Sequence, residues 1–67
     1  MDRDKIIETL KANVDRQISV TFVDGSVDSL LVISVDDEGF VHESEGEQYW
    51  STFEDVADIS DANASSN

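Results

Sequence analysis

Residues 17–35, QISVTFVDGSVDSLLVISV, constrain the fold more than any other stretch, because β-branched residues lie on both sides of one Asp-Gly pair. Branched side chains favour extended backbone, and Asp-Gly between apolar runs is a strong signal for a β-hairpin. A two-residue turn at Asp24 and Gly25 pairs residues whose numbers sum to 49, so Phe22 faces Val27. The sequence therefore predicts that a sheet begins with this stretch.

That register also predicts which side chains of the second strand are buried. Side chains alternate between the two faces of a strand, so a register assigns every residue to a face. The expected core face consists of Ile18, Val20, Phe22, Leu31, Ile33 and Val35. Leu30 and Val32 then point to the other face, where a helix preceding the sheet is the expected cover.

An amphipathic helix is expected over residues 3–14. Its apolar residues recur at helical spacing and are Ile6, Ile7, Leu10 and Val14. Asp2 or Asp4 is expected to cap the first turn, and Asn13 is expected to take a left-handed conformation near the end. The apolar stripe is expected to pack on the sheet, and docking to a partner is the alternative.

Three further short strands are expected after the hairpin. Gly39 ends an acidic turn, DDEG, where a positive φ is expected, and Gly46 centres the next turn. Thr52 is expected to cap a single helical turn in TFED. The strands are expected over residues 39–44, 48–53 and 56–60. The prediction is one mainly β domain over residues 1–60, with one N-terminal helix and five antiparallel strands, and a disordered tail over residues 61–67.

Two stretches carry a resemblance to a known family. They are VTFVDGSVDSLLVISVDDEGFVHE, which follows the leading helix, and YWSTFEDVADIS, taken as a fourth strand, a one-turn helix and a closing strand. This order resembles a small SH3-like barrel of the Sm-like kind, which implies a five-stranded antiparallel barrel and an association with RNA. The Arg-Gly pair that lines the RNA pocket of such proteins has no counterpart, because no Arg follows Arg16.

The charge is divided unevenly along the chain. Sixteen acids oppose four bases, for a net charge of -12, and all four bases lie before residue 17. Residues 17–67 contain twelve acids and no Lys or Arg. Nucleic-acid phosphates and anionic membranes are bound through Lys and Arg, so neither is an expected direct partner. A basic protein surface, or a second copy of the chain in a homo-oligomer, is expected instead.

Tyr49 and Trp50 are adjacent, so on a strand they must point to opposite faces. A turn centred within ESEGEQ pairs residues whose numbers sum to 91, so Trp50 faces Val41 and Tyr49 faces His42. Trp50 is then expected in the core together with Phe53. Tyr49 and His42 are expected at the surface.

The expected partner surface is built around the exposed tyrosine. An aromatic ring surrounded by carboxylates suits a basic peptide or a cation, through cation–π attraction and charge. The residues expected to form this surface are Tyr49, His42, Glu43, Glu47 and Asp28.

No motif for catalysis, metal binding or cofactor binding is recognised. The chain has no cysteine, His42 is its only histidine, and its three glycines are isolated. Thiolate sites, histidine pairs for zinc and Gly-rich phosphate loops are therefore not expected, and neither is an enzyme. The N-terminal stretch MDRDKIIETL lacks the apolar region of a secretory signal, so a cytoplasmic location is expected.

These features favour a small, acidic, non-enzymatic protein-interaction module. Two alternative functions stay open: a nucleic-acid mimic that inhibits a basic nucleic-acid-binding protein, and an RNA-associated protein of the Sm-like kind. The charge also has an explanation that needs no partner, because acidic surfaces keep proteins soluble in concentrated salt.

Salt adaptation predicts how the stability of the fold depends on ionic strength. Uncompensated negative charges repel one another in the folded chain, and added salt screens this repulsion. The urea midpoint of unfolding, followed by circular dichroism, should therefore rise from dilute buffer to molar KCl. A midpoint that does not rise with KCl contradicts salt adaptation.

Overall fold

A computed structural model describes residues 1–60 and contains one helix and one five-stranded antiparallel sheet. The elements are α1 (Arg3–Ala12), β1 (Gln17–Phe22), β2 (Val27–Val35), β3 (Gly39–Ser44), β4 (Glu47–Thr52), the one-turn helix η1 (Phe53–Asp55) and β5 (Val56–Ser60). The prediction of a mainly β chain with one N-terminal helix and five antiparallel strands is confirmed. The predicted tail, residues 61–67, lies outside the described residues.

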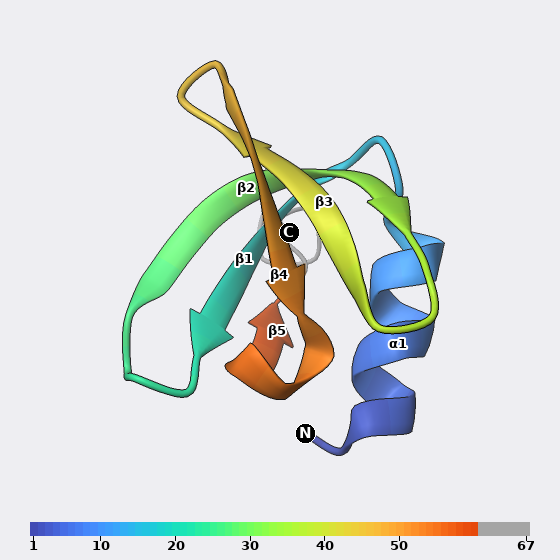
Figure 1. Cartoon of the computed structure of the whole chain (residues 1–67). Helices are drawn as coiled ribbons and strands as arrows, with labels where there is room; N and C mark the ends of the chain where they lie inside the picture. Colours follow the sequence, from blue (N-terminus) through green and yellow to red (C-terminus); the bar gives the residue numbers. More distant parts are fainter. Residues whose placement is uncertain (61–67) are drawn as a thin grey trace, which may run out of the picture.

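The sheet is strongly curved and has the strand order β4-β3-β2-β1-β5 (Figure 1). Its two edges are β4 and β5, and in the described part of the chain no hydrogen-bonded ladder joins them. The architecture is therefore compatible with a small barrel, although hydrogen bonds do not close it.

One hydrophobic core lies between α1 and the inner face of the sheet. Its buried members are Ile6, Leu10, Ile18, Val20, Leu30, Val32, Phe40, Phe53, Val56 and Ile59. The helix contacts β2, η1 and β5, and Figure 1 shows it against one end of the curved sheet. Across residues 1–60, no helix has the length and apolar character needed to cross a membrane.

The start of α1 agrees with the sequence prediction. The Asp2 carboxylate accepts a hydrogen bond from the Lys5 backbone N–H at 2.9 Å, which satisfies one of the free donors of the first turn. Ile6 and Leu10 are buried, and the half-buried Ile7 packs against the same core. The helical stripe therefore packs on the sheet, as predicted.

The end of α1 differs from the prediction. Asn13 has a φ of −118°, and its side-chain amide donates to the Thr9 carbonyl at 2.7 Å. The left-handed residue is Asp15, with a φ of 67°, and its N–H donates to the Val32 carbonyl at 2.7 Å. Val14 is exposed, because the chain has already left the helical path and turned toward β2.

The turn between β1 and β2 has three residues, 23–25, rather than the predicted two. Phe22 N–H donates to the Ser26 carbonyl at 2.8 Å, and Gly25 N–H donates to the Phe22 carbonyl at 2.9 Å. Gly25 has a φ of 92°, as expected for the last residue of such a turn. The Asp24 carboxylate accepts from both the N–H and the hydroxyl of Ser26, at 2.9 and 2.7 Å.

This turn makes the predicted register wrong by one residue. The observed partners include Ile18 with Leu30 and Val20 with Asp28. A shift of one residue reverses the face of every side chain in β2.

The faces of β2 are accordingly the opposite of those predicted. Leu30 and Val32 are buried in the core, whereas Leu31 and Ile33 are only half-buried. A bulge after Val32 then returns the half-buried Val35 to the core, as predicted. The helix therefore packs on the same core as the inner face of the sheet. The prediction that the helix covers a second apolar face of β2, separate from the core face, is wrong.

The register of β3 and β4 is the predicted one. Val41 lies opposite Trp50, and His42 lies opposite Tyr49. The two turn residues, 45 and 46, have φ values of 53° and 82°, as a tight two-residue hairpin turn requires.

The faces of β3 and β4 are nevertheless reversed. Phe40 is fully buried beside Phe53, with the ring centroids 6.5 Å apart, and His42 shares its face because it lies two residues further on. Trp50 is 49% exposed on the outer face, so the prediction that it lies in the core is wrong. Phe53 is buried, as predicted. Thr52 precedes η1 in the cap position, but its side chain makes no capping hydrogen bond.

Gly39 is required for close approach of two strands, and the positive φ predicted for it is not observed. A Cβ atom at this position would collide with the Ser51 carbonyl oxygen and would lie 2.9 Å from Cζ2 of Trp50. The Trp50 ring thus covers the backbone of β3 from outside. Asp36 forms the preceding turn by accepting from the N–H groups of Glu38 and Gly39 at 3.1 and 3.3 Å.

Substitution of Gly39 by Ala should destabilise the fold strongly. The added methyl group forces β3 and β4 apart, which costs on the order of 3 kcal/mol in the free energy of unfolding. Gly25→Ala is the control, since its site is open and the cost, about 1–2 kcal/mol, comes from the left-handed backbone alone. Urea unfolding of the two variants measures the difference. Equal losses would contradict the close approach of β3 and β4 at this glycine.

Candidate functional site

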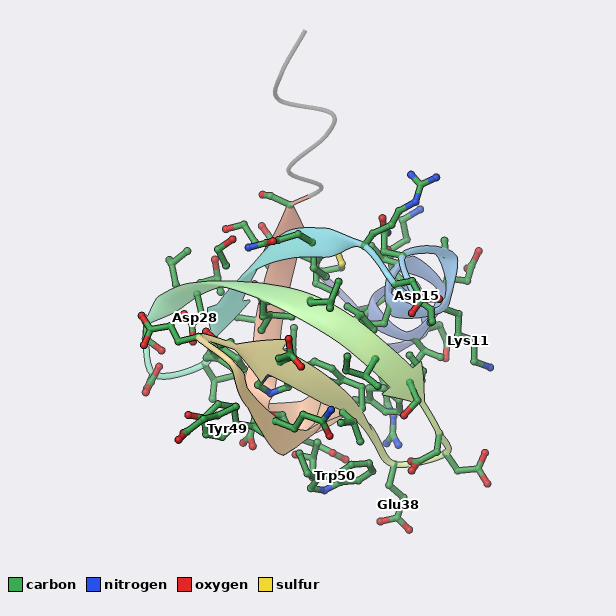
Figure 2. All side chains as sticks on the ribbon, turned by 90° about the horizontal axis from the view of Figure 1, so that it is seen from above. Lys11, Asp15, Asp28, Glu38, Tyr49 and Trp50 are labelled. Carbon is green, nitrogen blue, oxygen red and sulfur yellow. The ribbon has the colours of Figure 1, made fainter. Side chains whose placement is uncertain are left out.

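Four of the residues predicted to form the partner surface point to the inner face of the sheet, namely Asp28, His42, Glu47 and Tyr49, whereas Glu43 points to the outer face. Asp28 comes from β2, His42 and Glu43 from β3, and Glu47 and Tyr49 from β4. Figure 2 shows Asp28 and Tyr49 at the end of the sheet opposite Lys11, in the last turn of α1, and Asp15, in the turn that follows α1.

Two clefts open at this end of the sheet. The first is the aromatic cleft, which has a volume of about 380 Å³. It is lined by Asp28, His42, Ser44, Glu45, Tyr49, Trp50 and Ser51. The second has a volume of about 370 Å³ and is lined by Gln17, Asp28, Ser29, Leu31, Glu43, Ser44 and Glu45. Asp28 lines both clefts and lies at their junction.

The register of β1 and β2 brings Asp28 to this position. Asp28 lies opposite Val20 and is on the inner face, like the buried Leu30 two residues further on. It is nevertheless exposed. An unpaired carboxylate is tolerated on the inner face only because this end of the sheet is open to water.

Tyr49 is 47% exposed, as predicted, and stands at the edge strand. Its hydroxyl donates to Oε2 of Glu47 at 2.8 Å, and its ring lies 5.8 Å from the His42 ring. The hydrogen bond to Glu47, with the negative charges nearby, raises the pKa of Tyr49. The phenol is therefore neutral at physiological pH, and its ring face is held beside carboxylates.

His42 is buried, so the prediction that it lies at the surface is wrong. Only 5% of the residue is exposed, and three aromatic rings surround it. Their centroids lie 5.0 Å (Phe40), 5.8 Å (Tyr49) and 6.4 Å (Phe22) from the imidazole centroid. The imidazole thus forms the floor of the aromatic cleft, between the core and the exposed Tyr49.

The two ring nitrogens of His42 have different environments. Nε2 and Ser51 Oγ share a hydrogen bond of 2.9 Å, whereas Nδ1 is buried and has no hydrogen-bond partner within residues 1–60. Such an unmet group costs about 1–3 kcal/mol. Burial lowers the pKa of His42, and the negative charge of Asp28 opposes this only in part. The imidazole is therefore neutral at physiological pH.

Ser51 is a site residue that the sequence analysis missed. It lies opposite Phe40 in the predicted register, so the same pairing that placed Tyr49 opposite His42 could have placed the Ser51 hydroxyl beside the imidazole. A serine hydrogen-bonded to a histidine resembles a nucleophile and its base. In the described part of the chain, the third group that orients such a base is missing, because Nδ1 has no partner.

The charges around the clefts are all negative. Asp28, Glu45 and Glu47 are exposed and Glu43 is half-buried, while every Lys and Arg lies before residue 17. Among the residues that the structure describes, the one ion pair is Arg3 with Glu54, at 3.2 Å. In the same part of the chain, no three acidic or histidine side chains converge closely enough to hold a metal ion.

Comparison of the chain with known protein families, with curated proteins and with solved structures finds no match.

The buried imidazole predicts a pH-dependent stability. In the unfolded chain His42 binds a proton near its ordinary pKa of 6.5, whereas the folded state binds it only at lower pH. As the pH falls below about 6.5, the unfolded state takes up a proton that the folded state does not, so the free energy of unfolding decreases. The decrease ends below the folded-state pKa.

Urea unfolding of the wild type and of His42→Phe, from about pH 8 downward, measures this effect. The variant keeps an aromatic ring on the inner face but has no group that titrates there. As the pH falls across this range, the free energy of unfolding of the wild type should decrease relative to that of the variant. Parallel pH profiles would show that His42 is not buried in its neutral form.

Proposed function

We propose that this domain is a non-enzymatic interaction module that binds a basic protein segment at the end of the sheet bearing Asp28, Glu47 and Tyr49. One observation carries the proposal: the exposed ring of Tyr49 on the edge strand β4 lies among the carboxylates of Asp28, Glu45 and Glu47, and no Lys or Arg follows residue 16. Tyrosine and tryptophan are the side chains that contribute most often to binding energy at interfaces, and an acidic surround selects a cationic partner.

The edge of the sheet supports the same proposal. Tyr49 and Trp50 lie on β4, which pairs only with β3 in the described part of the chain, so one side of its backbone is available. An extended partner segment can add to such an edge through backbone hydrogen bonds. A second copy of the chain is the alternative partner, since within residues 1–60 both β4 and β5 are edge strands.

The proposed setting of this module is a small SH3-like barrel of the Sm-like kind in the cytoplasm. The order of one helix, four strands, a single helical turn and a last strand supports the barrel. The distribution of charge argues against direct RNA binding, because phosphates are bound through Lys and Arg.

Binding of a fluorescent decapeptide rich in Arg tests the proposal, with the same peptide carrying citrulline in place of Arg as the uncharged control. We expect the Arg peptide to bind in low salt and to weaken as salt is added, because exposed charges are screened. The double substitution Asp28→Asn and Glu47→Gln should weaken binding roughly tenfold, because two exposed charge contacts are lost.

The matched control is Glu8→Gln with Asp15→Asn, which removes the same charge from α1 and the turn after it. If both double variants weaken binding equally, the peptide is attracted by net charge and not by this end of the sheet. If neither Arg nor citrulline peptide binds, the proposal fails. Sedimentation of the chain alone shows whether it forms a dimer, which is the result expected if the partner is a second copy of the chain.

A further inference from the structure

We infer that the aromatic cleft is a binding pocket for a single guanidinium group, an arginine side chain supplied by the partner. The inference rests on the proposed function for the source of that arginine. The cleft lies where β2, β3 and β4 meet, at the open end of the sheet, and its volume is about 380 Å³. Pockets for small ligands begin at roughly 300 Å³, so the cleft is large enough for one side chain.

The walls of the cleft match the chemistry of a planar cation. Tyr49, with 47% of its surface accessible, lines the cleft with its ring on the same face as His42, whereas the ring of Trp50 lies on the outer face against the backbone of β3. A guanidinium group attracts aromatic ring faces electrostatically and can stack on them. Two carboxylates, Asp28 and Glu45, also line the cleft and neutralise a cation there. An anion would meet only like charges.

The floor of the cleft provides an independent observation. His42 lines the cleft, and only 5% of its surface is exposed. Its ring nitrogen Nδ1 has no hydrogen-bond partner in residues 1–60. When Nε2–H donates to Ser51 Oγ, Nδ1 is an acceptor that lacks a donor. A guanidinium group has five N–H donors and no acceptor, so it complements the carboxylates that line the cleft above this imidazole.

Guanidinium fits this cleft better than an ammonium group. It is more weakly hydrated, so it loses less hydration free energy when it enters a cleft whose floor is a buried aromatic cluster. Its flat face can lie on a tyrosine ring while its edge donates to a carboxylate, which a lysine ammonium does less well. The expected order of affinity is therefore arginine above lysine, and both above an uncharged analogue.

The test uses the full chain and N-acetyl-arginine amide as the probe, at constant ionic strength. N-acetyl-citrulline amide, which has the same shape without the charge, is the matched control probe. Amide NMR shifts follow binding and map the site, because the residues that shift should be those that line the cleft. We expect saturable binding of the arginine probe with a Kd on the order of millimolar, and much weaker binding of the citrulline probe.

Two variants of equal net charge locate the site. Asp28→Asn should weaken the arginine probe roughly three- to fivefold, as expected for one exposed charge contact, whereas Asp15→Asn should leave the affinity unchanged. Figure 2 shows these two acids on opposite sides of the molecule. Tyr49→Leu, which keeps an apolar side chain but removes the ring, should weaken the probe roughly two- to fivefold. A folded NMR spectrum of each variant excludes loss of structure as the cause.

The outcomes separate this inference from the proposed function. If the Arg decapeptide binds but the arginine probe gives no saturable shifts at the cleft, the pocket is overturned and the interaction module stands. Equal effects of Asp28→Asn and Asp15→Asn also overturn the pocket. If the arginine probe binds at the cleft while the decapeptide does not bind, the pocket stands as a site for a small guanidinium ligand, and the proposed protein partner fails.

Discussion

The hydrogen bond from Phe22 N–H to the Ser26 carbonyl, 2.8 Å long, sets the arrangement of the rest of the sheet. It closes a three-residue turn and thereby fixes the pairing of β1 with β2. That pairing directs Leu30 and Val32 into the core and brings Asp28 to the open end of the inner face. A turn shorter by one residue would place the other side of β2 inside and would remove the carboxylate from the cleft.

The two ends of the curved sheet have opposite characters. At one end α1 packs on the core and carries most of the positive charge, with Arg3 paired to Glu54 and lying 5.8 Å from the Phe53 ring centroid. At the other end, where Figure 2 shows Asp28 and Tyr49, nothing in the described residues covers the sheet. The inner face ends there in His42, Tyr49 and carboxylates. A fold of this size has one core, so an end that the helix does not cover is left to polar and aromatic side chains.

Much of the fold follows from local patterns. The bounds of β3 and β5, the cap at Asp2 and the register of β3 with β4 depend on residues close together in the chain, and these predictions agree with the structure. Strand β4 begins and ends one residue earlier than predicted, because Phe53 belongs to η1. Asp24-Gly25 is typical of both two-residue and three-residue turns, so this pair alone does not determine the length of the turn. The turn after β1 has three residues, and the prediction of two is wrong. Strand β2 is apolar on both faces, so its composition gave no means of detecting the error.

The site was only partly predictable for a related reason. Tyr49 and His42 were correctly paired, but Val41 is apolar and was expected inside, so His42 was placed at the surface. The larger Phe40 decides the face, because only its ring fills the space beside Phe53 in the core. The Ser51 hydroxyl then becomes the partner of the buried imidazole.

The sequence alone determined the number and order of the elements, the tight turn at Gly46 and the confinement of all basic residues to the region before residue 17. These depend on local backbone preference and on covalent order. The tertiary structure alone decided which face of β2, β3 and β4 is inside, and therefore that Asp28, His42 and Tyr49 share one cleft. The face of a strand depends on the volume that distant residues leave to be filled, and local periodicity contains no information about that volume.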